Sequence, residues 1–189
     1  MASRFFDSHF ASLEEAIAGI EIPSLIRETL ALKSVMYISF DGKIHEGQLV
    51  VHRDLVDEVG FLFTQLFHMR FPIAQVVPVS VYGWDDNASM LANNTSAFNL
   101  RKIEATGEYS QHSYGWAIDI NPMQNPCFEK RLNKVEPPEA VYDLSVPGTL
   151  TGDSGAVNLF RYNGWVWGGD WKSLQDMMHI QKRLDGKIS

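Results

Sequence analysis

The chain has 189 residues, of which 45% are hydrophobic and 21% charged, a composition typical of one soluble globular domain. Its 16 basic and 23 acidic residues give a net charge of -7, and the basic residues form no run, which argues against nucleic acid or an anionic membrane as a partner. The single cysteine, Cys127, excludes an internal disulfide. We expect no signal peptide and no membrane span, because charges interrupt residues 1–30 and every apolar run is short.

The N-terminal part is predicted to contain short helices, a hairpin and one long helix. Residues 12–15, Ser-Leu-Glu-Glu, form a capping-box pattern, and residues 24–32 have a helical spacing after a proline. Residues 35–40 and 48–52 are rich in β-forming residues and flank an Asp-Gly pair, which predicts either a hairpin or an extended excursion. Between residues 54 and 69, apolar side chains recur at steps of three and four, which predicts an amphipathic helix.

The middle of the chain alternates short β-like runs with polar segments. Residues 75–82, 95–101 and 116–120 are predicted strands. Residues 84–94 are rich in Asp and Asn, which favour turns and caps, so we interpret this segment as a loop that lines a site. Residues 123–150 contain four prolines and no sustained period, so we expect a long irregular loop that acts as a functional cover or as a mobile flap.

The C-terminal part is predicted to contain one helix and two closing strands. Asp153 can cap a helix that runs to about Tyr162, with Gly164 at the C′ position. Residues 165–167 and 177–181 have β-like composition. The whole pattern predicts an α+β fold, with helices packed on one side of a small, mostly antiparallel sheet.

Two segments concentrate the residues that carry chemistry. His112 and Asp119 offer a nitrogen and an oxygen ligand, and a glycine between them permits a sharp turn. A tryptophan-rich run at 165–171 is followed by Asp176 and His179, a carboxylate three residues before a second imidazole. Three ligands and a spare carboxylate would form a catalytic zinc set, with the fourth position open to water.

These motifs resemble a known family. The spacing Ser-x-His-x-x-Gly-x-Ala-x-Asp at 110–119, Trp-Gly-Gly-Asp-Trp at 167–171 and Asp-x-x-His at 176–179 is similar to the zinc D-alanyl-D-alanine carboxypeptidase and L-alanyl-D-glutamate endopeptidase family, which includes the VanX and VanY enzymes and several phage endolysins. With Asn-Asn-Thr-Ser-Ala-Phe-Asn-Leu-Arg at 93–101, the resemblance covers about residues 75–182. It implies a Hedgehog/DD-peptidase-like fold for one domain over 1–189, in which residues 1–74 form N-terminal helices and a hairpin.

The resemblance also implies a role for each motif residue. The implied ligands of Zn²⁺ are His112, Asp119 and His179. Asp176 would be the general base that takes a proton from the metal-bound water. Arg101 would act in catalysis and substrate binding, by pairing with a stem-peptide carboxylate or stabilising the developing oxyanion. Ser110 would help to place the substrate.

Several residues depart from the family pattern or have plainer interpretations. Many relatives have Glu where Asp176 stands, and Phe commonly follows the last ligand where this chain has Ile180. Asp85 and Asp86 are interpreted as turn residues, and core packing is expected for the tryptophans. The four histidines outside the motifs are expected at the surface or satisfied in the core; they are His9, His45, His52 and His68.

Two functions follow from the motifs. The first is a zinc metallopeptidase that acts on peptidoglycan stem peptides or muropeptides, at either the D-Ala-D-Ala or the L-Ala-D-Glu amide. The second is a zinc-containing binding or structural module without turnover, which would require a fourth protein ligand such as Cys127. A monomer is the default expectation, and the sequence leaves the cellular location open.

Overall fold

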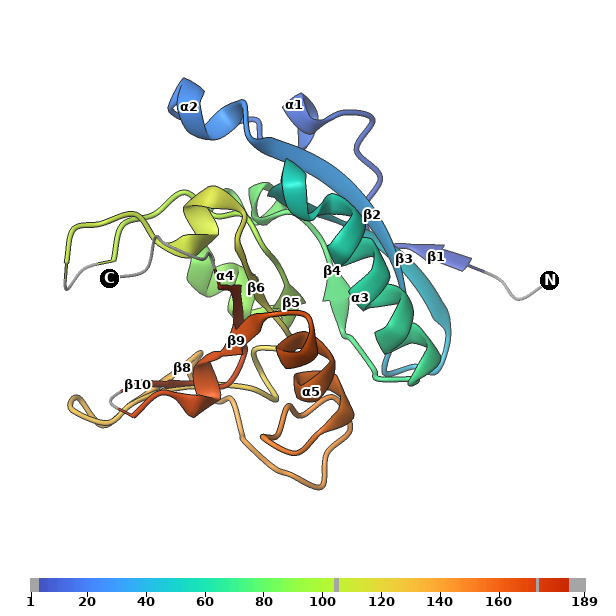
Figure 1. Cartoon of the computed structure of the whole chain (residues 1–189), viewed down its shortest axis with the longest axis vertical. Helices are drawn as coiled ribbons and strands as arrows, with labels where there is room; N and C mark the ends of the chain where they lie inside the picture. The colour runs from blue at the N-terminus through green and yellow to red at the C-terminus, as the bar shows by residue number, and fades with distance from the viewer. Residues whose placement is uncertain (1–3, 104–105, 173, 184–189) are drawn as a thin grey trace.

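The computed structural model describes residues 4–103, 106–172 and 174–183, in which helices and strands alternate as in an α+β protein (Figure 1). The α-helices are α1 (Leu13–Ala16), α2 (Ser24–Arg27), α3 (Val56–His68), α4 (Asp86–Leu91) and α5 (Gly155–Tyr162). The 3-10 helices are η1 (Arg53–Leu55), η2 (Val79–Tyr82), η3 (Gln111–Tyr114) and η4 (Gly168–Asp170). The strands are β1 (Arg4–Phe6), β2 (Leu30–Ile38), β3 (Ile44–His52), β4 (Gln75–Val76), β5 (Asn94–Thr95), β6 (Ala117–Asp119), β7 (Cys127–Glu129), β8 (Lys134–Glu136), β9 (Trp165–Trp167), β10 (Leu174–Asp176) and β11 (His179–Lys182).

The strands form several small sheets, which corrects the prediction of one sheet. Three sheets have three strands each, in the orders β1-β3-β2, β10-β7-β8 and β6-β11-β9, and β4 pairs with β5. The pairing is antiparallel except between β1 and β3 and between β4 and β5. The short strands of the C-terminal half cannot form one wide sheet, because loops and 3-10 turns separate them.

The predicted hairpin is the most regular part of the sheet structure. Strands β2 and β3 pair from Leu30 opposite His52 to Ile38 opposite Ile44. The turn is closed by the side chain of Asp41, whose Oδ1 accepts a hydrogen bond of 2.9 Å from the backbone N–H of Lys43. This Asx turn explains why the Asp-Gly pair was a reliable signal.

The predicted long helix is confirmed as η1 followed by α3. Its buried side chains recur at steps of three and four, at Val59, Leu62, Phe63 and Leu66. They share one hydrophobic core with Val35 of β2 and with Ile118 and Ile180, which lie in the strands of the C-terminal half. Figure 1 shows α3 lying along the hairpin, with α5 at its other side. We call β2, β3 and α3 the N-terminal layer. The core therefore connects this layer with the sheet β6-β11-β9.

The first helix follows its capping signal, whereas the second is shorter than predicted. The Ser12 hydroxyl accepts from the N–H of Glu15 at 3.2 Å, and the Glu15 carboxylate accepts from the N–H of Ala11 at 2.9 Å. The helix predicted over 24–32 ends at Arg27. The residues that follow join the ladder with β3 from Leu30 onward, so tertiary pairing overrides their helical spacing.

In the middle of the chain the predicted strands are mostly too long. The segment 75–82 contains the two-residue β4 and then η2, and the segment 95–101 contributes only Thr95 to β5. The polar segment 84–94 contains α4, for which Asp85 is the N-cap. The prediction that Asp and Asn in this segment form caps was correct. The interpretation of the segment as a loop was wrong, because the capped turn continues as a helix.

The C-terminal elements are closer to the prediction. The strands expected over 116–120, 165–167 and 177–181 exist as β6, β9 and β11. The loop expected over 123–150 contains the strands β7 and β8, which pair with each other and with β10. Helix α5 is capped by the Ser154 hydroxyl in place of Asp153.

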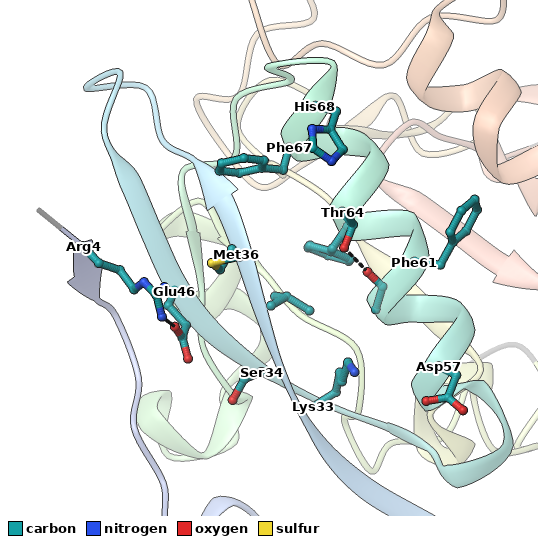
Figure 2. A pocket seen from close by; sticks show the side chains of 13 residues that line it. Arg4, Lys33, Ser34, Met36, Glu46, Asp57, Phe61, Thr64, Phe67 and His68 are labelled. Atoms are coloured by element: carbon teal, nitrogen blue, oxygen red, sulfur yellow. Dashed lines mark hydrogen bonds and ion pairs between the residues drawn. The ribbon is translucent and has the colours of Figure 1, made fainter. Parts of the chain in front are cut away.

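A groove of about 590 Å³ lies between β2 and α3 (Figure 2). Its walls include Ser34 and Met36 from the strand and Phe61 and Thr64 from the helix. None of the motif histidines or aspartates lines this groove, so the chemistry lies elsewhere in the molecule. In the ranges that the structure describes, no helix is both long and apolar enough to cross a membrane.

Candidate metal centre

The helical turn η3 places the first candidate ligand. Ser110 is its N-cap, and the hydroxyl accepts a hydrogen bond of 3.4 Å from the N–H of His112. The turn ends at Gly115, whose φ is 69° and whose hypothetical Cβ would lie 2.4 Å from the backbone nitrogen of His52. Only glycine combines this φ with so close an approach. The carbonyl of Gly115 accepts a 3.0 Å hydrogen bond from His52, which fixes η3 to the end of β3.

Two neighbouring strands place the other two candidate ligands. Asp119 of β6 and His179 of β11 are directly opposite each other in an antiparallel ladder. On its other side, Asp119 exchanges two backbone hydrogen bonds with Ser96, at 3.1 and 2.8 Å. The backbone of Asp119 is therefore held from both sides, and its carboxylate is aimed by regular strand geometry.

The three predicted ligands lie together in the structure. Their ligand atoms are all within 4.8 Å of one another, and the three side chains are buried. His112 Nε2 is 3.1 Å from Asp119 Oδ2, and His179 Nδ1 is 3.1 Å from Asp119 Oδ1. The two ring nitrogens that face each other are 3.1 Å apart. Two imidazole nitrogens and a carboxylate form a donor set that suits zinc.

The outward nitrogens of both rings have acceptors of their own. His112 Nδ1 lies 2.5 Å from the carbonyl oxygen of Ala97, and His179 Nε2 lies 2.9 Å from the side-chain oxygen of Gln181. Because a carbonyl can only accept, each outward nitrogen carries the ring proton. In the neutral rings the inward nitrogens then have lone pairs, which converge with the carboxylate of Asp119. Either a proton or a metal ion can be shared between these acceptors, and two imidazole nitrogens with a carboxylate fit a metal ion.

The acid-base properties of the cluster agree with this reading. Burial opposes a charge on His179, but its hydrogen bond to Asp119 and the negative charges of Asp119 and Asp176 outweigh burial and raise its pKa to about 9. Burial likewise raises the pKa of Asp119, but the charge and hydrogen bonds of the two histidines outweigh it, and the net pKa lies below its usual range. A proton therefore occupies the cluster when no metal is bound, and a metal ion would compete with that proton.

Asp176 lies at the edge of the cluster, on β10. Its backbone packs against Gly168 of the tryptophan-rich run, where a Cβ would lie 2.5 Å from the Asp176 carbonyl oxygen. Within the described ranges, Oδ1 of Asp176 is buried and has no hydrogen-bond partner. Burial, together with the charge of Asp119, raises its pKa to about 6 against the opposing charges of the two histidines and Arg101. Asp176 is half-buried as a residue, and its buried Oδ1 with a raised pKa is compatible with the predicted role of general base, which stays a prediction.

Cys127 lies opposite Asp176 in the ladder between β7 and β10. Its sulfur is not part of the group of ligand atoms that converge in the described part of the chain. Burial and the negative charge of Asp176 raise the pKa of the thiol, which disfavours the thiolate that binds metals. The geometry therefore offers three protein ligands and does not add Cys127 as a fourth.

Arg101 is held by residues that the sequence did not assign to the site. Its Nε forms an ion pair of 3.2 Å with Oδ2 of Asp86, and the other oxygen of that carboxylate, Oδ1, accepts a 2.9 Å hydrogen bond from the Asn99 side chain. The Ser113 hydroxyl accepts from the Arg101 N–H at 3.0 Å and donates to its carbonyl at 2.9 Å. Asp86, interpreted from sequence as a turn residue, therefore orients the arginine. Only a contact across the fold could have shown this.

The remaining predicted residues have structural contacts. Ser110 is buried as the cap of η3, and its role in substrate placement stays a prediction. Trp165 and Trp167 are buried in the core, as expected. The centroid of the Trp171 ring lies 5.3 Å from that of the His179 ring.

Outside the motifs, His45 pairs with Asp7 at 3.0 Å, away from the converging ligands. Gln181, which sequence reasoning missed, could have been found from its position two residues after His179 on one strand.

Comparisons with known proteins agree with the geometry. Residues 104–182 match a family model described as D-alanyl-D-alanine carboxypeptidase. The chain is 30% identical over 80 residues to the peptidoglycan L-alanyl-D-glutamate endopeptidase CwlK of Bacillus subtilis (strain 168), and the match spans 41% of each chain. No solved structure matches, so the Hedgehog/DD-peptidase-like fold stays a prediction. Both matches lie in the part of the chain that carries the motifs, and they make this part similar to D-alanyl-D-alanine carboxypeptidases and to an L-alanyl-D-glutamate endopeptidase.

Proposed function

We propose that this protein is a zinc metallopeptidase that cleaves peptidoglycan stem peptides or the muropeptides derived from them. The observation that carries the proposal is the convergence of three buried lone-pair donors, from His112, Asp119 and His179, next to a buried carboxylate with a free oxygen. When bound there, Zn²⁺ would supply a Lewis acid that polarises the scissile carbonyl and lowers the pKa of water to about 7. The family model and the name of the relative supply the substrate class.

Asp176 is the proton carrier of this mechanism. Because its pKa is raised to about 6, the carboxylate is ionised at neutral pH and still basic enough to take a proton from the attacking water. The buried environment that raises the pKa also keeps bulk water from competing for Oδ1. The protonated carboxyl can then donate the same proton to the leaving amine.

Arg101 is the group that binds the negative charge of the substrate. The Asp86 carboxylate engages its Nε edge, which orients the guanidinium while the side chain stays 40% exposed. The charge of Arg101 lowers the pKa of Asp176, so the two groups interact across the same site. An oriented guanidinium can bind a carboxylate of the stem peptide or the oxyanion that forms at the scissile bond. Ser110 would act through the position of η3.

The scissile bond is one of two amides. The family model is described by carboxypeptidase activity on D-Ala-D-Ala, whereas the matched relative is named for cleavage between L-Ala and D-Glu. A free substrate carboxylate follows the scissile bond in the first case, whereas the second bond lies inside the stem. Mass spectrometry of products can distinguish the two because they differ in the residues released.

The test is incubation of the zinc-loaded protein with a purified stem pentapeptide and, in parallel, with intact peptidoglycan. Loss of one D-Ala would establish a carboxypeptidase, and separation of L-Ala from D-Glu would establish an endopeptidase. Asp176→Ala should lower turnover by about two to four orders of magnitude while zinc stays bound, because the base is lost and the ligands remain. Asp57→Ala, on the exposed face of α3, serves as the matched control and should leave turnover unchanged.

The alternative is a zinc-containing binding or structural module without turnover. It would be favoured if zinc binds fully and neither product appears from either substrate. Equal activity of the wild-type and Asp176→Ala proteins would remove Asp176 from the mechanism.

A further inference from the structure

We propose that Gln181 is a positioning residue of the metal centre, which sets the orientation and the tautomer of His179. The inference rests on the proposed zinc function. Its basis is the 2.9 Å contact between His179 Nε2 and Gln181 Oε1, on the side of the ring that faces away from the other two ligands. The opposite nitrogen, Nδ1, is the atom that lies 3.1 Å from Asp119 and from His112.

Strand geometry explains why Gln181 can reach the ring. Residues two apart on a strand project from the same face, so β11 presents His179 and Gln181 side by side. Gln181 is flanked by Ala117 of β6 and Val166 of β9, which are its direct partners in the two ladders. These neighbours have no polar side-chain atoms. The amide of Gln181 is therefore the side-chain group that this part of the sheet provides for the outward nitrogen.

The amide can act on the tautomer in two opposite ways. When Oε1 faces the ring, Nε2 must carry the proton and the Nδ1 lone pair is available to a metal ion. If the amide were turned so that its NH₂ faced the ring, Nε2 would accept and Nδ1 would carry the proton, which blocks metal binding. With Oε1 toward the ring, Gln181 acts on His179 as the Ala97 carbonyl acts on His112. Each oxygen accepts the proton of the outward ring nitrogen, so the inward nitrogen keeps its lone pair.

This reading predicts an order of zinc affinities for variants at position 181. Glu offers only acceptor oxygens, so Gln181→Glu should bind zinc at least as tightly as the wild-type protein. Leu has a similar volume and no acceptor, so Gln181→Leu should bind zinc about 10- to 100-fold more weakly, the usual cost of losing the partner of a ligating histidine. A role limited to packing predicts the opposite order, because Leu preserves apolar contacts and Glu introduces a buried charge.

The experiment is a competition titration of zinc against a chromophoric chelator, carried out on the wild-type protein, Gln181→Leu and Gln181→Glu. Gln65→Leu, the same change at a half-buried position of α3, is the matched control. The absorption spectrum of the Co²⁺-loaded proteins gives a second readout, since a reoriented imidazole changes the ligand field. Circular dichroism of the metal-free proteins shows whether each variant is folded.

The outcomes separate this inference from the proposed function. If the wild-type protein binds no zinc, both fail. If it binds zinc and Gln181→Leu binds within twofold of wild type, only the role of Gln181 is overturned. If Gln181→Leu does not fold, the Glu variant decides: affinity equal to or tighter than wild type supports the inference, and affinity more than tenfold weaker overturns it.

Discussion

The N-terminal layer and the region around the metal centre are built in different ways. The layer consists of the nine-residue strands β2 and β3 and the 13-residue helix α3, held by a long ladder and a continuous apolar face. The strands that position the candidate ligands, β6 and β11, have three and four residues. So few backbone pairs cannot fix the geometry of a site alone, and the missing constraint comes from individual polar side chains.

Asn125 illustrates this second kind of construction. It is fully buried, its Nδ2 donates to the carbonyls of Ile120 and Gly148 at 3.0 Å each, and its Oδ1 accepts from the N–H of Leu150 at 2.6 Å. One side chain thus ties the end of the β6 segment to the chain that leads into α5. Stability in the layer is spread over many apolar contacts, whereas geometry near the site depends on single hydrogen bonds.

Removal of a candidate ligand should have the largest effect, and it should change the metal centre while the N-terminal layer stays folded. His179→Ala should weaken zinc binding by more than about 100-fold, because loss of a direct ligand costs more than loss of a group that only hydrogen-bonds to a ligand. The helical and hairpin signals of the N-terminal layer should persist, since α3 and the hairpin are held by their own apolar face and by the ladder between β2 and β3. Zinc content after dialysis and circular dichroism test the two halves of this prediction. His68→Ala, an exposed histidine on α3, should retain full zinc, and full zinc in His179→Ala would refute the ligand assignment.

The complementary change removes packing from the layer. Leu62 is fully buried on α3, so Leu62→Ala should lower the free energy of unfolding by about 2–5 kcal/mol through lost burial and the cavity left behind. The folded fraction should keep its zinc affinity, because the ligands do not change. Phe61→Ala, at a neighbouring position that is 49% exposed, should cost far less. Urea denaturation measures both variants, and equal losses would contradict the assigned burial.

The same contrast explains how much could be predicted from the sequence. The periodicity of 54–69 and the Asp-Gly turn are local signals that tertiary structure reinforces, and both were correct. The strand expected over 75–82 is limited to β4 and is followed by η2, and the segment 123–150, expected to be an irregular loop, contains β7 and β8. In those segments the backbone follows contacts with distant residues, such as the ladder between β7 and β10, that no local pattern encodes.

The ligand set was predicted from the family resemblance; the structure brings His112, Asp119 and His179 together, and their role as zinc ligands stays a prediction. Their supporting groups were not predicted. The Ala97 carbonyl has no side-chain signature, and Asp86 reaches Arg101 only because α4 packs beside the segment that follows β5. A family resemblance predicts the motif residues that carry the chemistry. The groups that hydrogen-bond to them lie outside the motifs and become visible only in the folded structure.

The smallest expected effect is a pH dependence that belongs to the metal centre alone. In the metal-free protein the pKa of His179 is raised to about 9, above the ordinary histidine value of 6.5. The folded state therefore binds this proton more tightly, and the resulting stability is fully present below the lower value and is lost as the pH rises toward the upper one. The raised pKa of Asp176 acts at lower pH, and that of Cys127 at higher pH.

Between about pH 7 and 8.5 the free energy of unfolding of the metal-free protein should then fall, by at most about 1.4 kcal/mol per pH unit. Zinc should reverse the sign, because the metal competes with the proton for Nδ1 and gains affinity as the pH rises. Denaturation at several pH values, with and without zinc, measures both slopes. Leu62→Ala should retain them at lower overall stability, whereas His179→Ala should lose them. If both variants kept the same slopes, the titrating group would lie outside the metal centre, and the separation between the two regions would fail.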